Sequence, residues 1–343
     1  MNVKAPDLLV DPFGERSAVG FHRDMYLLGA RVRFESNSED LLRLVDAAYA
    51  GLPHHRLSGL TPRLNVRLVL TSSSRKRARA EPMPLRMMSG VGLIGAATES
   101  SSFMVVSPEN RSALVAVTPR MLRFPYHTRY ELIEFAIFTL ATRVQGLVAL
   151  HAACVGGGGR GVLLMGPSGA GKSTVTLQCL LDGLDFLAED SVFVAPDTLR
   201  ATGVSSFLHV RADSLRWIAD RRSVAGIRQS PVIVRRSGMR KYEVDLRRGE
   251  YSLAARPLEI KAAVFLSAQH AAEQQHMLKR LSRADALTRL VEEQAYAANQ
   301  PSWSSFARAA GRLPFFELRR GRHPSESVAV LRELIKSPSR AIR

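Results

Sequence analysis

One segment near the middle of the chain, Gly166 to Ser173, constrains the fold and the chemistry more than any other. It reads Gly-Pro-Ser-Gly-Ala-Gly-Lys-Ser and completes the pattern of a phosphate-binding loop, G-x-x-x-x-G-K-[ST]. Glycines let such a loop curl so that successive backbone N–H groups point at phosphate oxygens. The apolar run 161–165 before it is typical of a strand, and 173–181 after it predicts a helix whose positive end faces the same anion. The pattern and its context together favour a nucleotide site over a glycine-rich turn that matches by chance.

The end of the loop carries the groups that act on phosphate. Lys172 is expected to reach the β- and γ-phosphates, and the hydroxyl of Ser173 is expected to be a ligand of Mg²⁺. ATP is preferred over GTP by default, because the chain has no Asn-Lys-x-Asp segment to recognise guanine. The residues expected to bind ATP are Gly166, Pro167, Ser168, Gly169, Ala170, Gly171, Lys172, Ser173 and Thr174.

An acidic pair, Glu189-Asp190, follows a short apolar run at 186–188 that predicts a buried strand. Ligand groups in parallel α/β sheets gather at the carboxyl ends of strands, so this pair is expected to face the phosphates. One carboxylate would hold the metal, and the other would accept the proton of an attacking hydroxyl. The alternative is a solvated turn before the next apolar run, 191–194.

A histidine, His151, lies on an apolar run at 148–155 that is expected to form a hairpin with the strand entering the loop. The hairpin would bring His151 towards the phosphates. A lone histidine is more often a structural residue, and that alternative stays open at this point.

These three features together resemble the catalytic core of the HPr kinase/phosphorylase family. The resemblance is carried by His151-Ala152-Ala153, by the loop with Thr174, and by Gly183-Leu184-Asp185-Phe186-Leu187-Ala188-Glu189-Asp190, and it covers about residues 148–195. It implies an α/β fold with a P-loop kinase core of the HPr kinase/phosphoenolpyruvate carboxykinase type. It also implies protein-serine phosphorylation with ATP and Mg²⁺.

The resemblance further implies a division of roles. His151, Lys172, Glu189 and Asp190 would be catalytic. Ser173 and Asp190 would be the metal partners, and Glu189 the proton acceptor, although the residues leave open which carboxylate is the base. The chain lacks the R-G-x-G segment of true HPr kinases. It is therefore more similar to divergent HPr-kinase-like proteins found beside peptide-modifying systems, some of which phosphorylate lasso-peptide precursors.

Residues 1–145 predict an N-terminal α/β domain of unknown role, and 146–343 the catalytic domain. The N-terminal part contains expected strands at 64–70, 103–106 and 113–117 and an expected helix at 129–144. In the catalytic part, 260–266 and 315–318 predict strands, whereas 284–298 and 325–336 predict helices.

The segment 201–248 is basic and has no clear pattern. Its candidates for binding acidic groups of a substrate or for offsetting transition-state charge are Arg211, Arg235, Arg236, Arg240 and Lys241, with a solvated face as the alternative. Glu243 and Asp245, two residues apart, would either share a strand face near the site or pair with these arginines.

The net charge of +17 favours an anionic partner, here an acidic peptide or small protein as acceptor. The densest basic run, 75–79, has no interleaved aromatic residues, so nucleic-acid binding is disfavoured.

The start of the chain does not resemble a signal peptide, and no apolar run approaches the length of a membrane span. We therefore expect a cytoplasmic protein without a membrane partner; a homo-oligomer is left open. A small-molecule kinase and a nucleotide-gated binding or scaffold protein are the alternative functions.

Overall fold

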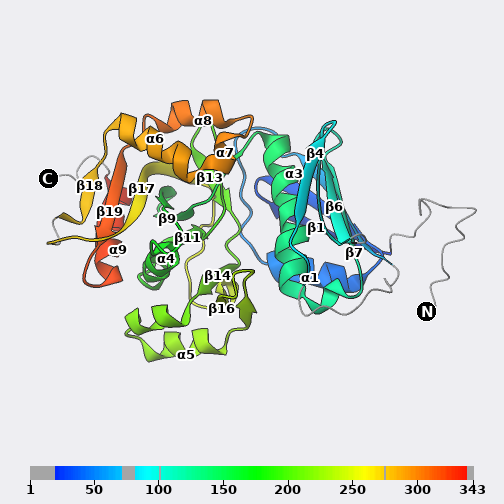
Figure 1. Ribbon diagram of the computed structural model, residues 1–343, viewed down its shortest axis with the longest axis horizontal. Helices are drawn as coiled ribbons and strands as arrows, with labels where there is room; N and C mark the ends of the chain where they lie inside the picture. The colour runs from blue at the N-terminus through cyan, green and yellow to red at the C-terminus, as the bar shows by residue number, and fades with distance from the viewer. Residues whose placement is uncertain (1–19, 72–81, 100–101, 274–275, 338–343) are drawn as a thin grey trace, which may run out of the picture. The chain divides into compact units, whose positions relative to one another are not determined.

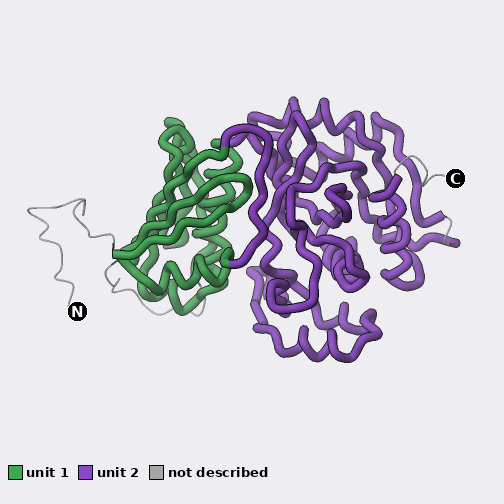
Figure 2. Tube along the Cα trace, turned by 180° about the vertical axis from the view of Figure 1, so that it is seen from behind, with its two compact units in different colours: residues 1–50, 61–144 green, residues 51–60, 145–343 purple. Residues whose placement is uncertain are grey.

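The computed structural model describes residues 20–71, 82–99, 102–273 and 276–337, and the basic run 75–79 lies outside them (Figure 1). The chain divides into two compact units. Unit 1 comprises Met1–Ala50 and Thr61–Val144, and unit 2 comprises Gly51–Leu60 and Gln145–Arg343 (Figure 2). The sequence favoured placing 51–60 with the N-terminal part, whereas the structure groups this segment with unit 2.

Unit 1 contains a seven-stranded sheet in the order β1-β2-β3-β7-β6-β5-β4. Its strands are β1 (Phe21–Leu27), β2 (Ala30–Ser36), β3 (Arg63–Leu70), β4 (Arg86–Gly90), β5 (Leu93–Glu99), β6 (Ser102–Ser107) and β7 (Ser112–Val117). Its helical segments are α1 (Glu39–Tyr49), η1 (Met121–Arg123), α2 (Pro125–His127), η2 (Thr128–Glu134) and α3 (Phe135–Gln145). Helix α1 is amphipathic and buries Leu41, Leu42 and Val45. The strands and the helix expected in this part of the chain are present.

Unit 2 is centred on a larger sheet in the order β11-β9-β10-β17-β13-β12-β8, with β19 and β18 continuing from β17. Its strands are β8 (Val148–Leu150), β9 (Ala153–Gly157), β10 (Arg160–Met165), β11 (Asp185–Ala188), β12 (Val192–Ala195), β13 (Arg200–Gly203), β17 (Leu258–His270), β18 (Leu278–Arg280) and β19 (Phe315–Arg320). Strand β17 pairs in parallel with both β10 and β19, so the carboxyl ends of these three strands share one edge of the sheet.

Helices cover both faces of this sheet, which confirms the expected α/β class (Figure 1). Helices α4 (Lys172–Leu181) and α9 (Pro324–Lys336) share one apolar core with alternate strand residues such as Val162 and Leu164. Helices α6 (Arg283–Glu293), α7 (Ala295–Ala298) and α8 (Trp303–Ala310) share the other core with residues such as Leu163 and Met165. This alternation follows from the period of two in a strand. No helix of the described segments is long and apolar enough to cross a membrane.

A separate three-stranded sheet, in the order β14-β16-β15, accounts for most of the segment that the sequence left unassigned. Its elements are β14 (Phe207–Val210), η3 (Ala212–Trp217), α5 (Arg221–Gln229), β15 (Val232–Val234), β16 (Arg240–Asp245) and η4 (Leu246–Arg248). Leu208, Ile227 and Val244 pack with Leu177 of α4 and Phe186 of β11 in a third core. This core fixes the small sheet against the helix that follows the phosphate-binding loop.

Two expected elements are interrupted. The strand expected at 148–155 is two strands, because β8 pairs with β12 whereas β9 pairs with β10 and β11. At the break, the side chain of Gln294 replaces a strand partner: its Oε1 accepts from His151 N at 2.8 Å, and its Nε2 donates to His151 O at 3.0 Å. Gln294 also separates α6 from α7, where the sequence predicted one helix over 284–298.

The segment 51–60 is fastened to unit 2 by the buried side chain of His55. Its Nε2 lies 2.8 Å from Ala254 O, and its Nδ1 lies 2.8 Å from Thr202 Oγ1. Burial lowers the pKa of His55, and the hydrogen bond to the Ala254 carbonyl only partly opposes this. The ring is therefore neutral, and donates from Nε2 to the carbonyl while Nδ1 accepts from the Thr202 hydroxyl.

Candidate active site

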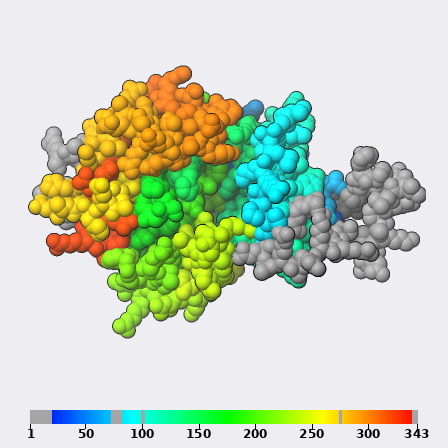
Figure 3. All heavy atoms as spheres, viewed as in Figure 1, coloured from blue at the N-terminus to red at the C-terminus, as the bar shows by residue number. Residues whose placement is uncertain are grey.

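The glycine-rich segment that matches the phosphate-binding pattern begins after β10 and leads into α4, the strand and helix that the sequence predicted around it. Gly166 and Gly171 have φ angles of 142° and 107°, which residues with a side chain rarely adopt. At Gly166 a Cβ atom would also lie 2.9 Å from Leu266 O, so the loop leaves no room for one there. On the face of unit 2 seen in Figure 3, the green residues around the loop and α4 reach the surface between the orange helical segment and the lime residues of the small sheet.

Lys172 lies across this loop rather than in solvent. Its side chain is buried, and Nζ donates to Gly166 O at 2.5 Å. Burial lowers the pKa of Lys172, while the charges of Asp190, Glu293 and Glu189 act in the opposite direction. The amine is thus held at the loop by backbone and surrounded by carboxylates, a position from which it can contact phosphate oxygens.

Glu189 lies directly after β11 and contacts the loop. Its carboxylate is only 5% exposed, and Oε1 accepts a hydrogen bond from Ser173 Oγ at 2.6 Å. The other oxygen, Oε2, accepts from the backbone N–H of His209 at 2.8 Å and lies 3.1 Å from the His209 ring Nδ1. The structure therefore places the first residue of the acidic pair against the hydroxyl expected to bind metal.

His209, on β14, is a site residue that was not predicted from the sequence. The ring is buried between two carboxylates, because its Nε2 also lies 3.4 Å from Glu243 Oε1. Burial alone would lower the pKa of His209, but the hydrogen bonds with Glu189 and Glu243 outweigh it and the pKa is raised. The raised pKa favours the imidazolium form, which lies between the buried side chains of Glu189 and Glu243 and fixes Glu189 in place. A lone histidine in a segment without recognisable pattern gave no signal for this role.

Asp190 points away from Ser173 and towards a different set of groups. Its Oδ2 accepts a hydrogen bond from Arg235 at 3.0 Å, and its backbone oxygen lies 3.2 Å from His151 Nδ1. Burial raises the pKa of Asp190, but the charge and hydrogen bond of Arg235, with His151 and Lys241, outweigh it and the pKa is lowered. Asp190 is therefore ionised. His151 is exposed beside it, so the three segments that carried the resemblance do lie close together, with His151 at Asp190 and Ser173 at Glu189.

The small sheet turns one polar face towards these groups. His209 pairs in register with Glu243, and Lys241 is two residues from Glu243 on the same face of β16. Arg235 extends from the end of β15 to Asp190. Arg236 and Arg240 are exposed on the same hairpin. Two other candidates of this segment lie elsewhere: Arg211 pairs with Asp213 at 2.7 Å, and Asp245 pairs with Arg247 at 2.8 Å.

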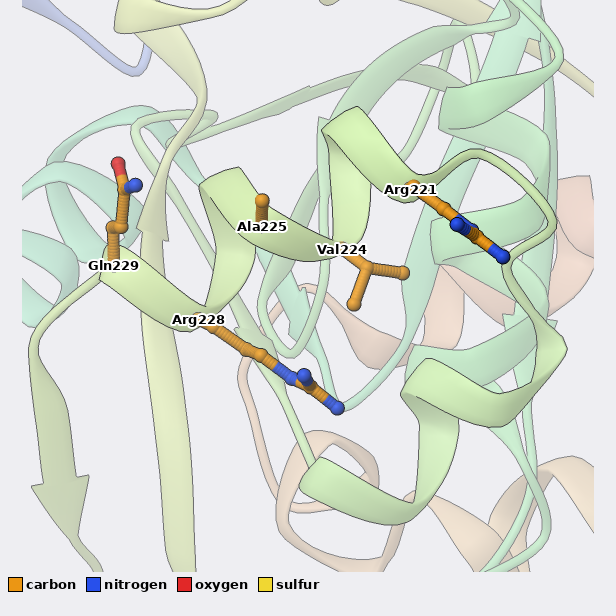
Figure 4. A pocket seen from close by; sticks show the side chains of 5 residues that line it. All are labelled: Arg221, Val224, Ala225, Arg228 and Gln229. Atoms are coloured by element: carbon orange, nitrogen blue, oxygen red, sulfur yellow. The ribbon is translucent and has the colours of Figure 1, made fainter.

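An open pocket of about 560 Å³ lies along α5 and contains none of the loop or acidic-pair residues. Arg221, Val224 and Arg228 project from one side of the helix, and Ala225 and Gln229 complete the lining (Figure 4). Within the small sheet and its helix, this pocket adds a second basic surface to the one on the β15–β16 hairpin. The residues that could act on phosphate converge at the loop instead.

The residues just before Glu189 pack closely against Gly203 of β13, and this packing holds Glu189 in position. A substitution of Gly203 tests this argument. A Cβ atom at Gly203 would lie 2.7 Å from Ala188 Cβ and 2.8 Å from Leu187 O, both just before Glu189. We expect Gly203→Ala to reduce the free energy of unfolding by about 1–3 kcal/mol, as overpacking does. Urea unfolding measures this change. The matched control is Gly226→Ala on α5, where a Cβ meets nothing within 4 Å and alanine favours the helix. Equal stability of the two variants would contradict the packing argument.

Comparisons with known proteins add little to this geometry. No family model matches the chain, and no curated protein matches it. Among solved structures, the chain is similar to the HPr(Ser) kinase/phosphatase from Coxiella burnetii, with 12% identity over 56% of this chain and 90% of that chain. The TM-score of this match is 0.28, a value too low to support a conclusion about the site. The function of the site is therefore inferred from the residues of this chain.

Proposed function

We propose that this chain is an ATP- and Mg²⁺-dependent kinase that transfers the γ-phosphoryl group to a serine hydroxyl of a peptide or small protein. The observation that supports this most directly is the 2.6 Å hydrogen bond from Ser173 to Glu189, which joins the phosphate-binding loop to the acidic pair. A loop alone supports nucleotide binding. This loop is also joined to two carboxylates, Glu189 and Asp190, and to two cationic side chains, Lys172 and Arg235. Such a set also supports transfer of the phosphoryl group, which needs mainly positioning and charge neutralisation. We assign the core to the HPr kinase/phosphoenolpyruvate carboxykinase type.

The donors at Ser173 and Glu189 are oxygen atoms, the ligands that Mg²⁺ prefers in proteins. We propose that these two residues hold the metal, which would neutralise charge on the phosphates. This assignment differs from the one implied by the family resemblance, in which Asp190 was the metal partner. Asp190 contacts Arg235 and His151 instead of Ser173, so we assign it to the acceptor side.

The proposed reaction is a direct transfer between two oxygen atoms. The acceptor oxygen forms a bond to the γ-phosphorus, the bond from that phosphorus to the bridging oxygen of the β-phosphate breaks, and ADP leaves. Asp190 would orient the serine hydroxyl, because its lowered pKa keeps the carboxylate ionised. It would take up the proton of that hydroxyl only as the bond to the γ-phosphorus forms, since a carboxylate with a lowered pKa is a weak base. Lys172 offsets the charge on the β- and γ-phosphates, and His151 lies beside the acceptor.

The acceptor would approach along the β15–β16 hairpin, where exposed Arg236 and Arg240 lie close in sequence to Arg235 and Lys241. A basic surface beside the acceptor position favours a peptide with acidic residues near its serine. Peptide precursors, including those of the lasso type, are one class of such acceptors.

A serine-centred peptide library with acidic, neutral and basic flanks tests this proposal. Incubation with MgATP is expected to yield phosphoserine in the acidic peptides, detected by mass spectrometry, and no transfer when serine is replaced by alanine. Omitting Mg²⁺ should abolish the product. Binding or hydrolysis of ATP without transfer to any peptide, under conditions where the protein remains folded, would overturn the proposal.

A further inference from the structure

A cluster of aromatic and cationic side chains lies beside the phosphate-binding loop and has no part in the chemistry proposed above. Trp217, the last residue of η3, and His323, directly before α9, form an edge-to-face pair with ring centroids 5.2 Å apart and an interplanar angle of 82°. The guanidinium of Arg216 lies over the indole, 4.8 Å from the ring centroid. Both rings of the pair are partly exposed, so a ligand can reach them.

Hydrogen bonds tie this cluster to the loop and to the first turns of α4. Thr174 Oγ1 lies 3.1 Å from Ser214 Oγ in η3, and Gln178 Nε2 donates to Trp217 O at 3.0 Å. On the other side, Arg320 at the end of β19 donates to Gly169 O in the loop at 2.8 Å. The cluster is thus adjacent to Thr174, the residue at which the loop ends.

The topology of the sheet gives a second, independent reason to expect a ligand here. Strands β10, β17 and β19 are parallel neighbours, so the loop after β10 and the short connection 321–323 after β19 leave the same edge of the sheet. Ligands of open α/β sheets bind outside the carboxyl ends of the strands. A nucleotide with its phosphates in the first loop therefore extends along this edge, and His323 lies in the connection two strands away.

The chemistry of the two rings suits a nucleobase. A flat, delocalised group can pack against the indole of Trp217, as the guanidinium of Arg216 does. His323 Nδ1 accepts the backbone N–H of Ser325 at 3.2 Å, so in the neutral ring the proton is on Nε2. An Nε2–H donor next to an indole matches the ring nitrogens of a purine, which are hydrogen-bond acceptors beside a π-face.

We propose that Trp217 and His323 form the subsite for the purine ring of the nucleotide whose phosphates are bound by the loop. This inference rests on the proposed function for the presence of a nucleoside triphosphate, and it adds where the base is recognised. Base–aromatic stacking accounts for roughly a 5- to 100-fold difference in affinity when the aromatic residue is replaced by alanine. The triphosphate is held by separate groups, so its own affinity does not depend on Trp217.

The two tryptophans of the chain make the first test direct. In a Trp303→Phe variant, Trp217 is the sole indole, and its fluorescence can be followed with excitation at the red edge of the absorption band. Trp303 packs against Phe306 in another part of unit 2. MgATP is expected to quench this fluorescence, whereas magnesium tripolyphosphate, which has no base, is expected to leave it unchanged. No response to MgATP at concentrations that saturate binding by calorimetry would overturn the inference.

Affinities of the variants provide the second test. We expect Trp217→Ala to weaken MgATP about 10-fold and to change tripolyphosphate affinity less than about 2-fold. Trp217→Phe should restore most of the loss. His323→Asn retains an N-cap side chain for α9 and removes the imidazole, so it should weaken MgATP without destabilising the helix. Retained tripolyphosphate binding shows that each variant is folded. Unchanged ATP affinity in Trp217→Ala would overturn the subsite alone, whereas loss of all nucleotide binding in the unmodified protein would overturn the proposed function.

Discussion

Replacing Lys172 with alanine is expected to reduce phosphoryl transfer by about 10³-fold or more, the largest effect that we expect from any single substitution. Removal of one preorganised donor at a developing charge costs about 10²–10³ in kcat, and Lys172 also provides a full positive charge at the loop. Its amine is already held at Gly166 O, so no surface lysine can take its place. Initial rates with MgATP and an accepted serine peptide measure the loss.

The matched control is Lys336→Ala, which removes the same charge from an exposed lysine near the end of α9. This variant should retain full activity. Lys172→Ala should also abolish the increase in Tm that MgATP produces in the unmodified protein, a readout that does not depend on the acceptor. Transfer at the original rate in Lys172→Ala would show that the loop is not the phosphoryl donor site.

Replacing Glu189 with glutamine is expected to lower kcat by about 10²- to 10³-fold and to raise the Mg²⁺ concentration needed for half-maximal rate. The amide is nearly the same size as the carboxylate, but it carries no charge for a metal and leaves the His209 imidazolium with one carboxylate instead of two. Titration of the rate with Mg²⁺ at saturating ATP measures both effects.

Glu333→Gln on α9 is the control for this change, because the carboxylate of Glu333 is exposed and pairs with Lys336 at 3.2 Å, away from the loop. Asp190→Asn provides the contrast that separates the two carboxylates. It should also lower kcat strongly, yet leave the Mg²⁺ requirement unchanged, because Asp190 contacts Arg235 and not Ser173. A raised Mg²⁺ requirement in Asp190→Asn and not in Glu189→Gln would reverse the assignment of roles.

The sequence predicted those parts of the site that follow from local rules. The loop between β10 and α4 has a fixed pattern, and β11 is a short apolar run that ends at charged residues, so both could be located from residue order. The division of Glu189 and Asp190 between two environments was not predicted, because the sequence analysis expected the pair to face the phosphates, and both residues lie after the end of β11. Which of them contacts Ser173 could not be predicted, because their partners His209 and Arg235 come from the small sheet, far along the chain.

The remaining parts depend on contacts between residues far apart in the chain. His209 reaches Glu189 only because the third core packs β14 against α4 and β11, and that core consists of scattered apolar residues. The interruption between β8 and β9 at His151 likewise could not be predicted from an apolar run. Its cause is the side chain of Gln294, which hydrogen-bonds the backbone of His151 in place of a neighbouring strand. Trp217 and His323 meet for the same reason: η3 and the start of α9 both pack along α4.

The attachment of His55 to Thr202 and Ala254 has a consequence for how this chain could be divided or recombined. Unit 2 is discontinuous, because one of its segments comes from within the first sixty residues. A protein cut to begin at residue 145 would lose the hydrogen bonds of His55 to Thr202 and Ala254, each of which contributes about 0.5–1.5 kcal/mol. The loop-bearing part expressed without residues 51–60 would therefore be less stable than unit 2 of the full chain.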